Sequence, residues 1–295
     1  MKSFGPIRTA LFVPGNRPDR VDKAVNAGAD AVIIDLEDAV ALSEKAETRP
    51  IVREKIVAHR DKRMIVRVNG LDSGFLHEDL VGVIVEDLEC VMIPKVDDPD
   101  QIREIHRLLL ELEKEKGMAT GAIAIIPLIE SARAVENIFQ IVSETTDPVR
   151  LLTVAFGAAD YTLDMGIEIT KEGTELFYAR SRIPIACRAA GIAPPLDTPY
   201  MIDLKDLDAL KADAGRAKQL GFQGKLCIHP NQIKPCHEVF SPTRDEIIYA
   251  ERVISAFEKA EAEGVAVLQL DGKFIDYPVV EKARRIINLA KITEA

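Results

Sequence analysis

Ile125-Ile-Pro-Leu-Ile-Glu130-Ser131 is an apolar run that ends in a carboxylate, and a helical pattern begins directly after it. The next unit repeats this arrangement, because the apolar run at residues 151–156 is followed by Gly157-Ala-Ala-Asp160. The two acids are separated by about 30 residues, which is close to the length of one strand–helix repeat. Successive parallel strands would therefore place both carboxylates at the same end of one sheet.

Two carboxylates held close together repel each other unless a positive charge lies between them. Ligands that are all oxygen favour a hard cation, with Mg²⁺ first and Mn²⁺ second. We therefore predict that Glu130 and Asp160 are metal ligands and that the rest of the chain is their scaffold. The spacing by itself agrees equally well with two ordinary helix N-terminal acids that the helix dipole stabilises.

The composition restricts the class of protein. A chain of 295 residues, of which 47% are hydrophobic, suffices for one large barrel domain or two small ones. The net charge of −10 argues against nucleic acid as the main partner. No apolar run approaches the roughly 20 residues that span a bilayer, and no signal segment opens the chain, so we expect no membrane association and a cytoplasmic location. The cysteines form no CxxC pair and are expected to be reduced.

Eight apolar, β-type runs are distributed along the first three quarters of the chain, with helical patterns in most of the gaps. The runs occupy residues 9–13, 31–36, 64–68, 91–94, 122–129, 151–156, 194–197 and 224–228. Nearly continuous apolar runs are typical of strands that are buried on both faces of a parallel sheet. The pattern predicts the α/β class and a TIM (β/α)₈ barrel over residues 1–234.

Polar residues recur directly after these runs, at the strand ends that form the active-site face of such a barrel. They are Asn16, Glu37, Asp38, Arg67, Lys95, Glu130, Asp160 and Asp197. Lys95 would suit the Schiff base of another type of aldolase, but a partner for the acids is the simpler interpretation. Arg67 could likewise be a salt-bridge partner of Glu37 and Asp38.

Residues 235–295 follow a different pattern. A long helix is expected at 243–263, then a hairpin that turns at Asp271-Gly272, and then a last helix that opens near Pro278. The segment is too small for an independent core. We predict a C-terminal extension that packs on the barrel and on a neighbouring subunit.

Several motifs occur together in one order along almost the whole chain. They are RTALFVPGN at 8–16, DLEDAV at 35–40, RVN at 67–69, PK at 94–95, LIE at 128–130, FGAAD at 156–160, GKLCIHP at 224–230 and DGKFID at 271–276. With these motifs the chain resembles the HpcH/HpaI aldolase–citrate lyase family, in its citrate lyase β-subunit-like branch with malyl-CoA lyase relatives. The segment Thr198-Pro-Tyr200 departs from the Gly-Val-Tyr usual in that family, which puts the local substrate contacts in doubt.

The resemblance implies a role for each matching residue. Glu130 and Asp160 would bind Mg²⁺, and Glu37 and Asp38 would order metal-bound waters. Substrate would be bound by Arg67, by Glu130 through the metal and by the backbone amides of Gly157, Ala158 and Ala159. Asp276 would act as acid or base in the active site of a neighbouring subunit of a homotrimer or hexamer, although it could instead cap the last helix. The catalytic set is then Arg67, Asp276, Glu37 and Asp38.

The predicted reaction is reversible cleavage of a 3-hydroxyacyl thioester, such as malyl-CoA or citryl-CoA, to a 2-keto acid and an acetyl thioester. Arg67 would stabilise the thioester enolate, and Asp276 would return a proton to it. Arg17 and Arg20 would contact the phosphates of CoA. Two alternatives stay open: a malyl-CoA thioesterase with the same site, and a β subunit of a multi-chain citrate lyase that is inactive alone. The sequence does not decide between CoA and an acyl-carrier protein.

Overall fold

The computed structural model of the chain describes residues 5–144 and 146–294. It divides into two compact units, Met1–His237 and Glu238–Ala295. The division lies three residues beyond the predicted boundary, and the predicted packing of the extension on the barrel and on a neighbouring subunit stays a prediction.

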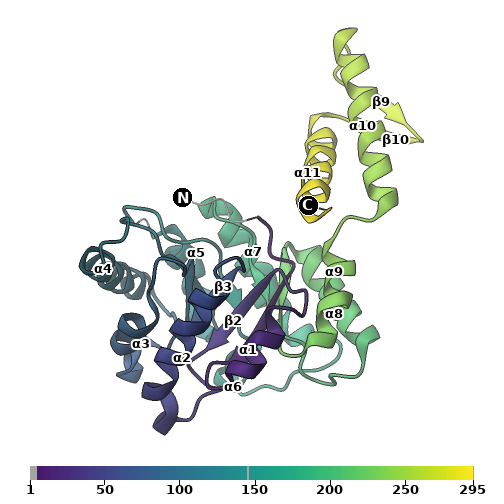
Figure 1. Cartoon of the computed structure of the whole chain (residues 1–295). Helices are drawn as coiled ribbons and strands as arrows, with labels where there is room; N and C mark the ends of the chain where they lie inside the picture. The colour runs from purple at the N-terminus through teal and green to yellow at the C-terminus, as the bar shows by residue number, and fades with distance from the viewer. Residues whose placement is uncertain (1–4, 145, 295) are drawn as a thin grey trace. The chain divides into compact units, whose positions relative to one another are not determined.

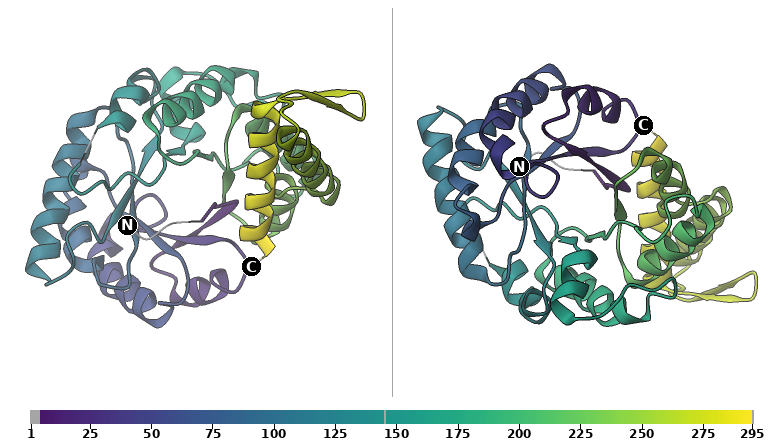
Figure 2. Two further views of the ribbon diagram at one scale, coloured as in Figure 1. Left: turned by 90° about the horizontal axis from the view of Figure 1, so that it is seen from above. Right: turned by 90° about the horizontal axis from the view of Figure 1, so that it is seen from below.

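Eight parallel strands of the first unit close into a barrel in chain order. Figure 1 shows β2 and β3 of this barrel from the side, and Figure 2 looks into the ring of strands. The strands are β1 (Thr9–Pro14), β2 (Ala31–Asp35), β3 (Met64–Arg67), β4 (Cys90–Ile93), β5 (Ala124–Ile129), β6 (Ala155–Phe156), β7 (Leu196–Asp197) and β8 (Gly224–Cys227). The barrel closes where Leu11 of β1 pairs with Cys227 of β8. The predicted TIM barrel is confirmed.

Helices surround this barrel in both views of Figure 2. They are α1 (Pro18–Ala24), α2 (Lys45–Ala58), α3 (Leu76–Val83), α4 (Pro99–Glu115), α5 (Ala132–Ser143), α6 (Ala158–Met165), α7 (Phe177–Ala190), α8 (Leu207–Leu220) and α9 (Ile233–Phe240). The helix α4 illustrates the local signals, because Asp98 and Gln101 form a capping box around Pro99. The short helices α3 and α6 were not predicted, since eight residues give too little periodicity.

The sixth and seventh strands are shorter than their apolar runs. In the run 151–156 only Ala155 and Phe156 form a strand, while Leu151 makes a single bridge to Ile125. In β7, Pro194 and Pro195 come directly before the strand, and proline has no N–H to donate to a ladder.

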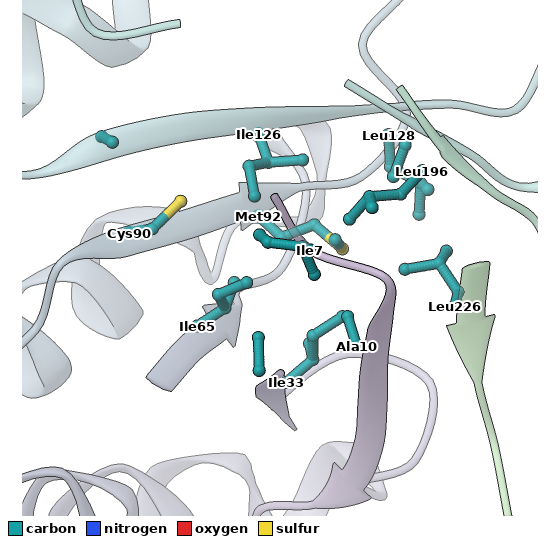
Figure 3. Packing of buried hydrophobic residues seen from close by; sticks show 13 residues of the cluster. Ile7, Ala10, Ile33, Ile65, Cys90, Met92, Ile126, Leu128, Leu196 and Leu226 are labelled. Atoms are coloured by element: carbon teal, nitrogen blue, oxygen red, sulfur yellow. The ribbon is translucent and has the colours of Figure 1, made fainter. Parts of the chain in front are cut away.

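The barrel interior is filled by apolar side chains from all eight strands, and Figure 3 shows them pointing toward one another. The buried members are Ile7, Ala10, Ala31, Ile33, Ile65, Cys90, Met92, Ala124, Ile126, Leu128, Ala155, Leu196 and Leu226. Leu128 and Leu226 also line the cavity described below. The packed interior is therefore the floor of the candidate site.

The second unit has its own small core. The helices α10 (Arg244–Ala262) and α11 (Tyr277–Glu294) pack together, and the antiparallel hairpin β9 (Leu268–Leu270)–β10 (Lys273–Ile275) joins them in sequence. Asp271 and Gly272 both have positive φ angles, as a tight two-residue hairpin turn requires. The predicted helical and hairpin extension is confirmed. Among the described helices, none is both long and apolar enough to cross a bilayer.

Candidate active site

A cavity of about 410 Å³ opens at the carboxyl ends of the barrel strands. Its wall contains Arg67, Glu130, Asp160 and the Gly157–Ala159 segment, together with Asp38. An adjoining cavity of about 570 Å³ is lined by Glu37, Asp38 and Lys95 among others. The barrel thus brings the strand-end residues predicted from the sequence to one face, because parallel strands all end there.

Glu130 follows β5 and is buried, with 3% of its surface exposed. Its Oε1 accepts a hydrogen bond of 2.8 Å from the backbone N–H of Lys95, which is its only donor among the described residues. Burial raises the pKa of Glu130 to about 8, and the nearby charges of Glu37 and Asp160 add to this rise. The protein by itself therefore supplies too little positive charge and too few hydrogen bonds to stabilise the ionised form of Glu130.

Gly157 packs directly against this carboxylate. A Cβ atom at position 157 would lie 2.6 Å from Oε2 of Glu130 and 2.9 Å from its Cβ. A Cβ atom essentially never lies so close to a non-bonded heavy atom, so glycine at position 157 is what allows Glu130 to take its position. This gives a physical reason for glycine between β6 and α6.

Arg67 is held by Asp35, a residue that the sequence analysis did not select. Its Nε donates to Oδ1 of Asp35 at 2.7 Å and its Nη2 donates to Oδ2 at 2.6 Å. The remaining amino group, Nη1, lies 3.0 Å from Oε2 of Glu37 and 3.5 Å from Oδ2 of Asp38. The ring of Phe12 stacks on the guanidinium, with its centroid 5.0 Å from Cζ.

Asp35 also orders the backbone next to it, because its carboxylate accepts hydrogen bonds from the N–H groups of Glu37 and Ala39. Burial alone would lower the pKa of Arg67, but the hydrogen bonds and the charge of Asp35 raise it. Arg67 therefore stays charged in this ion pair. The sequence signal available for Asp35 was that it is the one acid within the apolar run 31–36. Pairing between Arg67 and the acids at 37 and 38, an alternative considered from the sequence, is also observed.

Lys95 has two separate contacts to the acids. Its backbone has a φ of 55°, which is uncommon for a residue other than glycine and directs the amide to Glu130. Its Nζ lies 3.1 Å from Oε1 of Glu37. Burial alone would lower the pKa of Lys95, but the hydrogen bond and charge of Glu37 raise it. For the acid Glu37 burial acts in the other direction and raises the pKa, while the charge of Arg67 opposes this rise. The observed contacts agree with the interpretation of Lys95 as a partner for acids.

The amides of the segment 157–159 are not equivalent. The N–H of Gly157 donates to the carbonyl of Ile129 in the barrel ladder, at 2.9 Å. The N–H of Ala158 donates to Oγ1 of Thr198 at 3.0 Å. The N–H groups of Ala159 and Asp160, in the first turn of α6, have no acceptor among the described residues. Two of the three amides expected to bind substrate are therefore already engaged within the protein.

Asp197 belongs to a buried network rather than to the cavity wall. Both of its oxygens accept hydrogen bonds from Arg180 at 2.9 Å, and Lys225 pairs with Asp197 and Asp213. The buried part of this network carries two cations, Arg180 and Lys225, and two carboxylates, so its charges balance in the interior. The partly exposed Arg216 also contacts Asp213, at 3.3 Å.

Asp276 lies in the second unit, directly before α11. Its Oδ1 accepts a hydrogen bond of 3.2 Å from the N–H of Val279, so it does cap the last helix. A cap does not preclude a second role, and the place of Asp276 in a neighbouring subunit's site stays a prediction.

The two arginines expected to contact the phosphates of CoA, Arg17 on the β1–α1 connection and Arg20 in α1, are not among the residues that line the cavity.

The donor set fits a hard cation. Glu130 and Asp160 supply only oxygen. Burial is the main cause of the raised pKa of Glu130, and a cation bound by both acids would offset the repulsion that adds to it. Within the described part of the chain, no three His, Cys, Asp or Glu side chains are grouped so that they could hold a metal. Two carboxylates nevertheless suit Mg²⁺, which usually keeps several waters and completes its shell with substrate oxygens.

Comparison with known proteins identifies the family. The model of the HpcH/HpaI aldolase/citrate lyase family matches residues 8–230. The chain belongs to this family. It is a carbon–carbon lyase, as expected from the motifs.

Two curated lyases are similar to it. The citrate lyase subunit beta of Leuconostoc mesenteroides is 38% identical over 285 residues, which cover 96% of this chain and 93% of the relative. The L-malyl-CoA/beta-methylmalyl-CoA lyase of Cereibacter sphaeroides is 32% identical and covers 98% and 96% of the two chains.

A solved relative shares the architecture of this HpcH/HpaI family chain. The CitE protein of Mycobacterium tuberculosis, crystallised with magnesium, acetoacetate and coenzyme A, is 28% identical with a TM-score of 0.74. The match covers 99% of this chain and 100% of the other. Another structure from the same organism, a citrate lyase beta subunit, was solved with oxaloacetate and magnesium, and it is 29% identical and covers 80% of this chain and 98% of the other, with a TM-score of 0.65.

Proposed function

We propose that this chain is a Mg²⁺-dependent lyase that reversibly cleaves a 3-hydroxyacyl thioester, such as malyl-CoA or citryl-CoA, to a 2-keto acid and an acetyl thioester. One observation carries the proposal: a single cavity wall combines Glu130, whose ionised form the protein does not stabilise, with Asp160 and with Arg67, which Asp35 orients. Relatives named for citrate and malyl-CoA cleavage, and relatives crystallised with magnesium and keto acids, support it.

Glu130 and Asp160 would hold the cation, with Mn²⁺ as a substitute for Mg²⁺. Bound there, Mg²⁺ supplies Lewis-acid polarisation of the substrate's oxygen atoms. Glu37 and Asp38 lie beside the site, where they can accept hydrogen bonds from waters. This explains why two direct carboxylates suffice.

Arg67 would stabilise negative charge on the thioester oxygen when the carbon–carbon bond breaks. It suits this role because Asp35 fixes one edge of the guanidinium, through Nε and Nη2, and leaves Nη1 on the side of Glu37 and Asp38. A guanidinium that is already oriented needs no rearrangement during the reaction. Phe12 covers its face and limits the access of water.

The amides of Ala159 and Asp160, at the N-terminus of α6, would bind a carboxylate of the keto acid. Of the three amides expected to bind substrate, only that of Ala159 is then available, since the N–H groups of Gly157 and Ala158 have acceptors within the protein. The apolar floor of Leu128 and Leu226 excludes water from the cleaved bond.

Asp276 would return a proton to the enolate carbon from a neighbouring subunit, in a homotrimer or a hexamer. Its position in a separate compact unit of the chain is compatible with this arrangement. We also propose a cytoplasmic location, as expected from the sequence.

The test is a panel of thioesters, including malyl-CoA and citryl-CoA, assayed with Mg²⁺ while both keto acid and free thiol are followed. We expect stoichiometric keto acid and acetyl thioester, and loss of turnover in Glu130→Ala. Full activity in excess chelator would refute the proposal. Free malate and CoA as net products would instead identify a malyl-CoA thioesterase.

The identity to citrate lyase β subunits favours one second candidate, a subunit of a multi-chain lyase that acts on an acyl-carrier-protein thioester. This candidate predicts no turnover by the chain alone with any CoA thioester. Activity would then appear when acyl-carrier-protein and transferase subunits are added.

A further inference from the structure

Thr198 follows β7 and lines the same cavity as Arg67 and Glu130. It is 3% exposed. Its Oγ1 accepts the hydrogen bond of 3.0 Å from the N–H of Ala158, at the N-terminus of α6. The hydroxyl is therefore fixed between a strand end and a helix start, both of which belong to the cavity wall.

This contact leaves the hydroxyl proton of Thr198 without a partner. A hydroxyl has one proton to donate in addition to its two lone pairs. The amide of Ala158 uses a lone pair, and no described residue accepts the proton. Because buried polar groups in folded proteins nearly always find a partner, the donor is available to a molecule in the cavity.

We propose that Thr198 is a substrate-binding residue, whose hydroxyl donates a hydrogen bond to a carboxylate oxygen of the bound 2-keto acid. The inference rests on the proposed function, because it concerns the same cavity. The amide of Ala158 then takes no direct part in binding; it positions the hydroxyl. The free N–H groups of Ala159 and Asp160 lie in the same helical turn, so the three donors favour an anion together.

The experiment measures binding of pyruvate by calorimetry in saturating Mg²⁺, together with binding of Mg²⁺ alone. Thr198→Val keeps the shape and removes the hydroxyl, and Thr198→Ser keeps the hydroxyl. Thr162→Val is the matched control: the Thr162 hydroxyl lies on α6, the helix whose first N–H bonds to Thr198, and it is buried and donates to the carbonyls of Ala158 and Ala159. Thr162 is not among the residues that line the cavity.

A hydrogen bond to a charged group has a measurable effect, so we expect Thr198→Val to raise the Kd of pyruvate about 10-fold or more. Thr198→Ser and Thr162→Val should stay within about threefold of the wild type, and all variants should bind Mg²⁺ alike. Unchanged pyruvate binding in Thr198→Val would overturn the inference. So would an equal loss in Thr162→Val, or a wild type that binds no pyruvate.

The design separates this inference from the proposed function. A wild type that binds pyruvate in a Thr198-dependent manner but cleaves no thioester would refute the lyase and support the binding role. Turnover with a pyruvate affinity that is indifferent to Thr198 would support the lyase and refute the binding role.

Discussion

Asp35 and Arg67 form a two-point contact across neighbouring strands, from Nε to Oδ1 at 2.7 Å and from Nη2 to Oδ2 at 2.6 Å. The residues are register partners, since Asp35 of β2 lies beside Arg67 of β3. A planar guanidinium matches a carboxylate in this geometry, which gives orientation as well as affinity. The barrel sheet thus sets the direction of the one cation that, among the described residues, forms ion pairs with both Glu37 and Asp38.

We expect Asp35→Asn to lower kcat by about 100-fold, because a small displacement of a catalytic group has effects of that size. Steady-state kinetics with the best thioester measures it. Asp30→Asn is a matched control, since Asp30 precedes the same strand and accepts paired hydrogen bonds from Arg8. That variant should lose stability and retain kcat. Equal losses of kcat in the two variants would show that Asp35 acts only through folding.

Gly157→Ala should weaken Mg²⁺ binding and turnover by about 10- to 100-fold, because the new Cβ displaces Glu130. Isothermal titration with Mg²⁺ measures the first effect directly. Gly215→Ala in α8 is the control, because no atom lies within 4 Å of a Cβ there. It should increase stability slightly and leave the metal affinity unchanged. A Gly157→Ala variant with normal affinity would contradict the packing argument.

The stability of the metal-free protein should fall as pH rises from about 4.5 to about 8, because the folded pKa of Glu130 lies near 8 and the unfolded one near 4.5. In this window the folded state binds the extra proton, so ionisation favours unfolding. Glu130→Gln should therefore stabilise the protein at pH 8 by about 3 kcal/mol in chelator. Urea unfolding at pH 5 and pH 8 measures the difference.

Glu113→Gln is the control of opposite sign. Glu113 pairs with the buried Arg150 through two hydrogen bonds of 2.6 and 2.7 Å. Loss of the carboxylate leaves the buried cation Arg150 without its counter-charge, which should destabilise the protein by about 3–5 kcal/mol. If Glu130→Gln destabilised the metal-free protein at pH 8 as Glu113→Gln does, Glu130 would be a structural acid rather than a metal ligand.

Lys95 should not form a Schiff base with keto acids. Glu37 raises the pKa of its ammonium group, and a protonated amine is not a nucleophile. Treatment with pyruvate and borohydride should leave activity unchanged, and mass spectrometry should find no adduct on Lys95. A reduced pyruvyl adduct at this lysine would identify a different type of aldolase.

Asp276→Asn should lower kcat at least tenfold while leaving the melting temperature unchanged, because asparagine caps a helix about as well as aspartate. The cap at Val279 is thereby kept, and only the acid is lost. Mixing this variant with Glu130→Ala under conditions of subunit exchange tests the neighbouring-subunit role. Recovered turnover supports a shared site, and no recovery places Asp276 outside it.

Much of the site was predictable because a parallel barrel has only one active-site face. Once eight strands were expected, Glu37, Arg67 and Glu130 had to lie at the same end. Asp35 was not selected, because a single acid inside an apolar run gives no sign of the direction of its side chain. The engaged amide of Ala158 was not predictable either, since its partner Thr198 lies 40 residues away in sequence.

The sequence by itself determined the strand–helix order, the hairpin at Asp271-Gly272 and the end of the barrel where the acids gather, because periodicity, turn chemistry and strand polarity are local properties. Only the tertiary structure decided which acid holds Arg67, that Glu130 is buried without adequate compensation, and that glycine at position 157 makes room for it. These properties depend on distances between side chains of different strands. Such distances arise when the barrel closes and brings together residues far apart in sequence.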